Sequence, residues 1–274
     1  MLQLRHFREP VNGQPVENTF EAVDDYSGEQ LGACVIYADD NPALFPARPY
    51  HVRLELEGDP IPDALLGAAV ARGRELCVAS GKYCRLYTRC HPYDDALLAS
   101  LEDMGFRDND GLVRMRKSLP SEFDFRLPPG CTELRDDLSD PTEQRYFLER
   151  YNDLYNSQHD MAWLARFMRR DDFTRIQLVS STDLAGEILI WREDEVGVIG
   201  YIQTSRRWRR LGVATCLLGL ASRCFERLGL ENAEASVRVR IPHILKTMEN
   251  VGFRQIDLLM RYPGLDVDAG ETRG

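Results

Sequence analysis

The sequence predicts an α/β (α+β) protein built from two tandem copies of one domain. Runs of β-branched and aromatic residues alternate with runs of apolar residues at helical spacing. The order strand, helix, strand, helix, strand occurs twice, and both times the second helix ends in Gly-Phe, at Gly105-Phe106 and Gly252-Phe253. The two glycines are 147 residues apart. A repeat of that length indicates a duplicated domain and not a solenoid.

The first copy is expected over residues 1–119. A short alternating run opens the chain, a turn signal at 24–28 separates two strands, and a loop with three prolines covers 41–49. The predicted strands cover 2–7, 20–23, 31–37, 51–56, 83–87 and 113–115, and the predicted helices cover 64–78 and 94–104.

A proline-rich stretch predicts a linker at 120–130, and the second copy then covers 131–274. Asp140-Pro141 is a strong helix start, because an Asp N-cap is followed by Pro at the first helical position. Helices are expected from 141, from 160, over 214–228 and from 242, with strands at 174–180, 185–191, 196–202, 233–239 and 256–260.

The segment between the strand at 196–202 and the helix after it is rich in Arg and Gly. It reads Arg209-Arg210-Leu211-Gly212-Val213-Ala214. Backbone N–H groups at a helix N-terminus have no partner within the helix, and the local positive charge attracts anions. The segment is therefore predicted to bind a phosphate group, although a basic loop that caps an ordinary helix would have a similar sequence.

The spacing Arg209-x-x-Gly212-x-Ala214 after a strand resembles the acyl-CoA pyrophosphate loop of the GCN5-related N-acetyltransferases. The resemblance implies that each copy is a mixed central sheet flanked by helices, and that acetyl-CoA or another acyl-CoA is the cofactor. It also implies that Arg209 adds charge to the pyrophosphate site and that the strand end lies beside the pantetheine arm. The implied cofactor-binding residues are Ile202, Gln203, Thr204, Arg209, Arg210, Leu211, Gly212, Val213, Ala214 and Thr215.

The corresponding segment of the first copy reads Glu57-Gly58-Asp59-Pro60-Ile61-Pro62-Asp63. Carboxylates repel a pyrophosphate, and proline has no N–H group to donate. The first copy is therefore expected to lack a phosphate loop and to act as a scaffold or as a wall of the substrate site. The two helices that follow the first strand in the second copy are also missing from it.

The usual proton-transfer residues of the resembled family are absent. The family's Tyr position holds Met248, its Glu or His positions hold Val198 and Gly200, and its Asn position holds Ile241. Three other residues are candidate catalytic groups: Glu187, Tyr201 and His243. Each has a simpler alternative, namely an exposed strand acid, a core tyrosine and a surface histidine. Water-relayed protons or an amine that binds already deprotonated would also serve.

Composition limits the partners. With 44 acidic and 34 basic residues, the formal net charge of −10 argues against a sequence-independent nucleic-acid binder. The seven cysteines form no CxxC pair, the five histidines are scattered, and no metal site is expected. Because neither a leading signal segment nor a long apolar run occurs, we expect a cytoplasmic protein with no membrane partner.

These observations predict an acetyl-CoA-dependent N-acyltransferase that modifies a primary amine of a small molecule or peptide. The alternative is a non-catalytic CoA-binding or regulatory protein of the same fold, which the missing proton-transfer residues favour. An aminoacyl-tRNA-dependent transferase is a third possibility, and the acidic charge balance argues against it. The sequence specifies neither the acceptor, the acyl chain length nor the oligomeric state.

Overall fold

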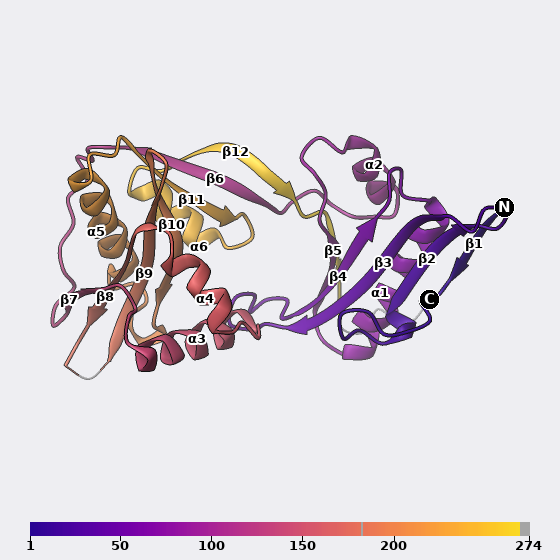
Figure 1. Ribbon diagram of the computed structural model, residues 1–274, viewed down its shortest axis with the longest axis horizontal. Coiled ribbons are helices and arrows are strands. Elements are labelled where there is room, and N and C mark those ends of the chain that lie inside the picture. The colour runs from indigo at the N-terminus through magenta and orange to yellow at the C-terminus, as the bar shows by residue number, and fades with distance from the viewer. Residues whose placement is uncertain (182, 269–274) are drawn as a thin grey trace. The chain divides into compact units, whose positions relative to one another are not determined.

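The computed structural model describes residues 1–181 and 183–268 and shows two compact units (Figure 1). The first unit comprises Met1–Leu112, Leu154–Asn156 and Leu258–Gly274, and the second comprises Val113–Asp153 and Ser157–Asp257. Residues 269–274, at the end of the predicted second copy, lie outside the described part.

The first unit holds a sheet in the order β1-β2-β3-β4-β5-β13. Its strands are β1 (Leu2–Arg5), β2 (Thr19–Asp24), β3 (Gln30–Asp40), β4 (Tyr50–Glu57), β5 (Cys84–Thr88) and β13 (Gly264–Val267), and its helices are α1 (Asp63–Ser80) and α2 (Asp95–Asp103). Leu65, Leu66 and Ala69 of α1 are buried in one core with Val52 and Leu54 of β4. Between β1 and β2 the chain forms only the 3-10 turn η1 (Val16–Asn18), which confirms that this copy lacks the two helices.

The sheet of the second unit has the order β12-β6-β11-β10-β9-β8-β7. Its strands are β6 (Gly111–Ser118), β7 (Thr132–Asp136), β8 (Asp171–Val179), β9 (Leu184–Glu193), β10 (Val196–Thr204), β11 (Asn232–Arg238) and β12 (Arg254–Arg261). Its helices are α3 (Pro141–Tyr155), α4 (Met161–Met168), α5 (Val213–Arg227) and α6 (Pro242–Asn250), with the 3-10 turn η2 (Arg206–Trp208) before α5.

Helices cover both faces of this second sheet. A Cβ atom on Gly186 of β9 would lie 2.7 Å from Val213 Cγ1, so this residue faces α5. The next residue, Glu187, is paired with Arg150 of α3. Successive strand residues point to opposite faces, so α5 and α3 lie on opposite sides of the sheet. The mixed sheets with flanking helices confirm the predicted fold class.

The two Gly-Phe pairs end their helices in the same way. Phe106 N–H donates to Leu101 O at 3.0 Å after α2, and Phe253 N–H donates to Met248 O at 3.0 Å after α6. Both glycines have a positive φ, 90° at Gly105 and 97° at Gly252, which favours glycine. The same helix ending in both units is the structural counterpart of the sequence repeat.

Two strands lie outside the sequence ranges expected for their sheets. β6 was expected to complete the first copy, yet it lies between β11 and β12 in the second sheet. β13 follows the second copy along the chain, yet it pairs with β5 of the first sheet. The units of the structure therefore do not follow the ranges 1–119 and 131–274, and Leu154–Asn156 and the end of β12 also belong to the first unit. The alternation of a strand predicts that it joins a sheet and does not specify which one.

Within residues 1–181 and 183–268, no helix is long and apolar enough to cross a membrane.

Candidate acyl-CoA site

The loop between β10 and α5 leaves helix donors free. Arg210 has a φ of 66° and Gly212 a φ of 79°, so the chain turns sharply before α5. The first helical hydrogen bond runs from Cys216 N–H to Gly212 O at 2.9 Å, and no side chain caps the helix. The N–H groups of residues 213–215 therefore precede the first helical bond. Such a terminus favours an anion.

The start of α5 lies close to the ends of β9 and β10. A Cβ atom on Gly186 would lie 2.6 Å from Gln203 O and 2.7 Å from Val213 Cγ1, so glycine is required for this close approach. A Cβ atom on Gly212 would meet nothing within 4 Å. Gly212 is therefore required for its backbone conformation, and the space in front of it is open.

The charge around the loop is positive. The loop carries four exposed arginines: Arg206, Arg207, Arg209 and Arg210. Arg207 Nη1 lies 3.4 Å from Asp183 Oδ2, and in the described part of the chain the other three arginines make no ion pair. Arginine binds phosphate well because its guanidinium donates from a planar fork of N–H groups. The loop thus combines free backbone donors with unneutralised cationic side chains.

Strand β10 separates from β11 before the strand ends. Its parallel pairing with β11 covers Val196 to Ile199, and its pairing with β9 shifts in register between Ile199 and Tyr201. Beyond this bulge, β10 pairs with β9 alone as far as Thr204. The predicted pantetheine-binding residues Ile202, Gln203 and Thr204 lie on this stretch. Thr204 Oγ1 is buried and has no hydrogen-bond partner among the described residues.

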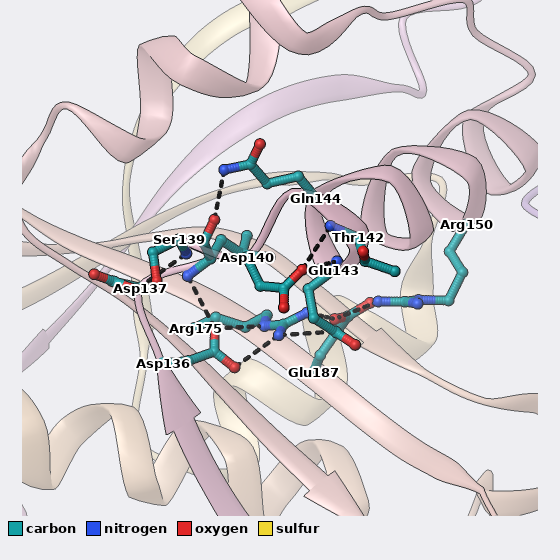
Figure 2. Close-up of polar contacts among 11 residues, drawn as sticks. Asp136, Asp137, Ser139, Asp140, Thr142, Glu143, Gln144, Arg150, Arg175 and Glu187 are labelled. Carbon is teal, nitrogen blue, oxygen red and sulfur yellow. Dashed lines mark hydrogen bonds and ion pairs between the residues drawn. The ribbon is translucent and has the colours of Figure 1, made fainter.

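Glu187 is fully buried and bound to arginine (Figure 2). Arg150 Nε donates to Glu187 Oε1 and Arg150 Nη2 donates to Oε2, both at 3.0 Å. Arg175 Nη1 lies 3.9 Å from Glu187 Oε2. The alternative of an exposed strand acid is therefore wrong. The bidentate pair with Arg150 engages both carboxylate oxygens, and the side chain has no exposed surface that an acceptor could reach.

Arg175 is the centre of a network that was not predicted from the sequence (Figure 2). Its side chain is 1% exposed on β8. Nε and Nη2 donate to the two carboxylate oxygens of Asp136, at 2.9 and 2.7 Å, and Nη2 also lies 3.0 Å from Glu143 Oε2. These contacts join the end of β7, the first turn of α3 and the sheet. They fix the helix that carries Arg150, and with it the position of Glu187.

Tyr201 packs among aromatic side chains on the same face of the sheet. It is 4% exposed, and its ring centroid lies 5.3 Å from that of Phe147 and 5.4 Å from that of Tyr151. Its hydroxyl donates to Gln203 Oε1 on the same strand. Trp191 covers the neighbouring Gly200, where a Cβ atom would lie 1.9 Å from the indole ring. The structure thus places Tyr201 in the packed face of the strand.

His243 is the third candidate, and it lies near the loop. It is an exposed residue in the first turn of α6. Partial desolvation, and then the positive charge of Arg209, hold the pKa of His243 below its usual value of about 6.5. The imidazole is therefore mainly neutral at pH 7 and able to accept a proton. Met248, by contrast, is 1% exposed and belongs to the core.

The first unit differs at the equivalent place. Helix α1 begins at Asp63 after Pro62, and no side chain caps it. Glu57, Asp59 and Asp63 are exposed residues around this turn. Three carboxylates thus stand where the second unit has four arginines.

Comparison with known proteins supports the fold. No protein-family model matches the sequence, and no curated protein is significantly similar to it. Among solved structures, the chain is similar to a GCN5-related N-acetyltransferase from Sphaerobacter thermophilus, with 15% identity, 94% of this chain and 84% of that chain covered, and a TM-score of 0.51. It is also similar to an Enterococcus faecalis protein described as a probable N-acyltransferase, with 10% identity, 98% and 73% covered, and a TM-score of 0.58.

A third similar structure is a tandem GNAT protein from the clavulanic acid biosynthesis pathway, with 14% identity and 98% of this chain and 99% of that chain covered. Its TM-score of 0.47 is too low to add to the argument. At identities this low, the likenesses show the fold alone. The chain therefore has the fold of the GCN5-related N-acetyltransferases, in two tandem copies.

Proposed function

We propose that the second unit binds an acyl-CoA, with acetyl-CoA as the first candidate, and transfers its acyl group to a primary amine of a small molecule or peptide. The start of α5 carries this proposal. Uncapped N–H groups, a left-handed Gly212 and three exposed arginines that make no ion pair with the described residues occur together there. They form a site for a pyrophosphate beside a strand with one unpaired edge.

The residues of the loop have separate roles in this proposal. The backbone N–H groups of Arg210 to Thr215 hold the pyrophosphate, and Arg209 adds charge. The backbone of Ile202 to Thr204 lies beside the pantetheine arm, and Thr204 Oγ1 has hydrogen-bonding capacity to spare. When bound, the thioester supplies an activated acyl group.

His243 is the strongest of the three candidates for proton transfer. It is exposed, its lowered pKa favours the neutral form, and Arg209 is close enough to influence it. Glu187 is held by Arg150, and Tyr201 is packed against Phe147. A general base must be accessible and unprotonated at the working pH, and His243 meets both conditions.

A non-catalytic acyl-CoA binder is the second candidate function. The burial of Glu187, Tyr201 and Met248, at 0%, 4% and 1% exposure, favours it, because none of these side chains is free to exchange a proton with an acceptor. The two functions share the cofactor site and differ in whether a thiol is released.

Thiol release separates the two functions. The protein would be incubated with acetyl-CoA and a panel of primary amines, alongside a His243→Gln variant and a His91→Gln control, since His91 is an exposed histidine of the first unit. Enzymatic function predicts amine-dependent thiol release that falls about 100-fold in His243→Gln and is unchanged in the control. Tight acetyl-CoA binding without thiol release for any amine would support the binder instead.

The first unit is proposed to bind no acyl-CoA and to act as a scaffold. The N–H groups at the start of α1 are uncapped like those of α5, but the exposed carboxylates of Glu57, Asp59 and Asp63 around them would repel a pyrophosphate. One acyl-CoA per chain is therefore expected.

A further inference from the structure

The second unit contains a pocket at the end of its sheet opposite the α5 loop. Leu119, just after β6, donates its N–H to Glu231 O just before β11, and β11 runs parallel to β10. The end of β6 therefore lies near the start of β10, whereas the α5 loop follows the end of β10. The pocket has a volume of about 550 Å³ and is lined by the end of β6, the segment after it, the end of α6 and the start of β12.

Lys117 is the buried charge of this pocket. It follows the buried Val113 and Met115 on the same face of β6 and is itself 5% exposed. Its Nζ contacts Ser222 Oγ at 3.4 Å, and it lies 5.4 Å from the ring centre of Phe123 and 5.9 Å from that of Phe253. In the described part of the chain, no carboxylate lies within ion-pair distance of it. A buried ammonium without a counter-charge is costly.

The other charged groups around the pocket leave this charge unbalanced. Arg116 is paired with Glu234 at 2.7 Å. Arg254 donates to Glu249 O and Phe253 O and has no carboxylate partner in the described residues. Burial lowers the pKa of Lys117, and the negative charge of Glu226 offsets this lowering only in part.

The acids nearby do not pair with Lys117. Glu226 Oε1 accepts the N–H of Ser121 at 2.7 Å. Glu122 belongs to the pocket lining and is an exposed residue with no ion pair in the described part of the chain. Apolar groups complete the wall, since Pro120, Phe123 and Val251 line the same space. A cation therefore stands at the base of a partly apolar pocket.

We propose that this pocket binds a small organic carboxylate, with the carboxylate on Lys117 and an apolar body against Phe123 and Val251. The carboxylate supplies an ion-pair partner that Lys117 does not have among the described residues, in a place where burial makes a charge-assisted hydrogen bond stronger than it would be in water. The proposal is independent of acyl transfer, because the pocket and the α5 loop share no residue.

Benzoate is a suitable probe, with benzamide as its neutral counterpart of the same shape. Both would be titrated by calorimetry into the full chain and into three variants, Lys117→Met, Lys246→Met and Arg209→Ala. Lys246 is an exposed lysine of α6 and controls for loss of charge, and Arg209→Ala controls for binding at the acyl-CoA loop.

The expected result is benzoate binding at one site, with affinity about 10- to 100-fold weaker in Lys117→Met and unchanged in both controls. Benzamide should bind about as weakly to the unmodified protein as benzoate binds to Lys117→Met. Benzoate binding should also raise the pKa of Lys117, measured by NMR titration of its side chain with and without benzoate, because a carboxylate counter-charge opposes the lowering that burial causes. This second readout needs no variant. Absence of benzoate binding, equal binding of benzamide, or full affinity in a folded Lys117→Met protein would each overturn the proposal.

Discussion

Arg85 and Asp266 form an ion pair, 181 residues apart in the chain, with 3.0 Å between Nη1 and Oδ1. Arg85 lies on β5 and is fully buried, and Asp266 lies opposite it on the exchanged strand β13. Arg85 Nη2 also donates to Asn109 Oδ1 at 2.8 Å. A Cβ atom on Gly264 would lie 2.6 Å from Arg85 Cζ. The exchanged strand is thus fitted closely to a buried charge of the first unit.

Asp266→Asn should destabilise the first unit by about 1–3 kcal/mol, because a buried guanidinium loses part of its counter-charge. Asp266 is itself 36% exposed, which limits the effect. Urea unfolding followed by far-UV circular dichroism would measure the change.

The matched control for this variant is Asp268→Asn. Asp268 pairs with Arg48 at 2.8 Å and is 53% exposed, so its loss should change stability by less than about 1 kcal/mol. Tryptophan fluorescence would not report on the first unit, because all three tryptophans, Trp163, Trp191 and Trp208, lie in the second unit. Equal destabilisation by both substitutions would contradict the role given to Arg85.

Arg175→Met should destabilise the second unit by about 3–5 kcal/mol, because Asp136, Glu143 and Glu187 would lose their shared partner. Tryptophan fluorescence during urea unfolding reports on this unit. The comparison variant is Arg192→Met on β9, whose pair with Asp172 is exposed and worth about 1 kcal/mol or less. If Arg175→Met were no less stable than Arg192→Met, the network would have no structural role.

The pKa of His243 should rise when Arg209 is replaced by alanine, because the nearby positive charge disfavours the imidazolium. A folded-state pKa below about 6.5 means that His243 contributes stability above that pH and loses it as the pH falls through the lowered value. NMR titration of the imidazole proton measures this pKa directly. Arg206→Ala is the control, and a shift equal to that of Arg209→Ala would show that the effect is not specific to Arg209.

The sequence predicted most of the fold because its signals are local. The strand and helix patterns, the Asp140 cap and the two Gly-Phe helix ends each depend on a few neighbouring residues. The exchange of β6 and β13 was not predictable in this way, because strand pairing depends on residues far apart in the chain.

The same distinction between local and long-range determinants applies to the candidate site. The α5 loop was predictable from adjacent residues, since Gly212 and the arginines act through the backbone conformation and charge of one turn. The burial of Glu187 was not, because it depends on Arg150 and Arg175 from other elements. Nothing in the residues next to Lys117 predicted that its side chain would be buried with no described carboxylate within ion-pair distance.

Calorimetric titration of acetyl-CoA would show whether the start of α5 binds the cofactor, with the unmodified chain compared with Gly212→Ala and Gly229→Ala. Both glycines have a similar positive φ, 79° and 74°, and both have open space for a Cβ atom, but they lie at opposite ends of α5. Both substitutions should therefore cost about 1–2 kcal/mol of stability.

The proposed site at the start of α5 predicts one acetyl-CoA per chain, bound at least about tenfold more weakly by Gly212→Ala and with unchanged affinity by Gly229→Ala. No binding to the unmodified chain, two sites per chain, or equal affinities of the two variants would contradict it.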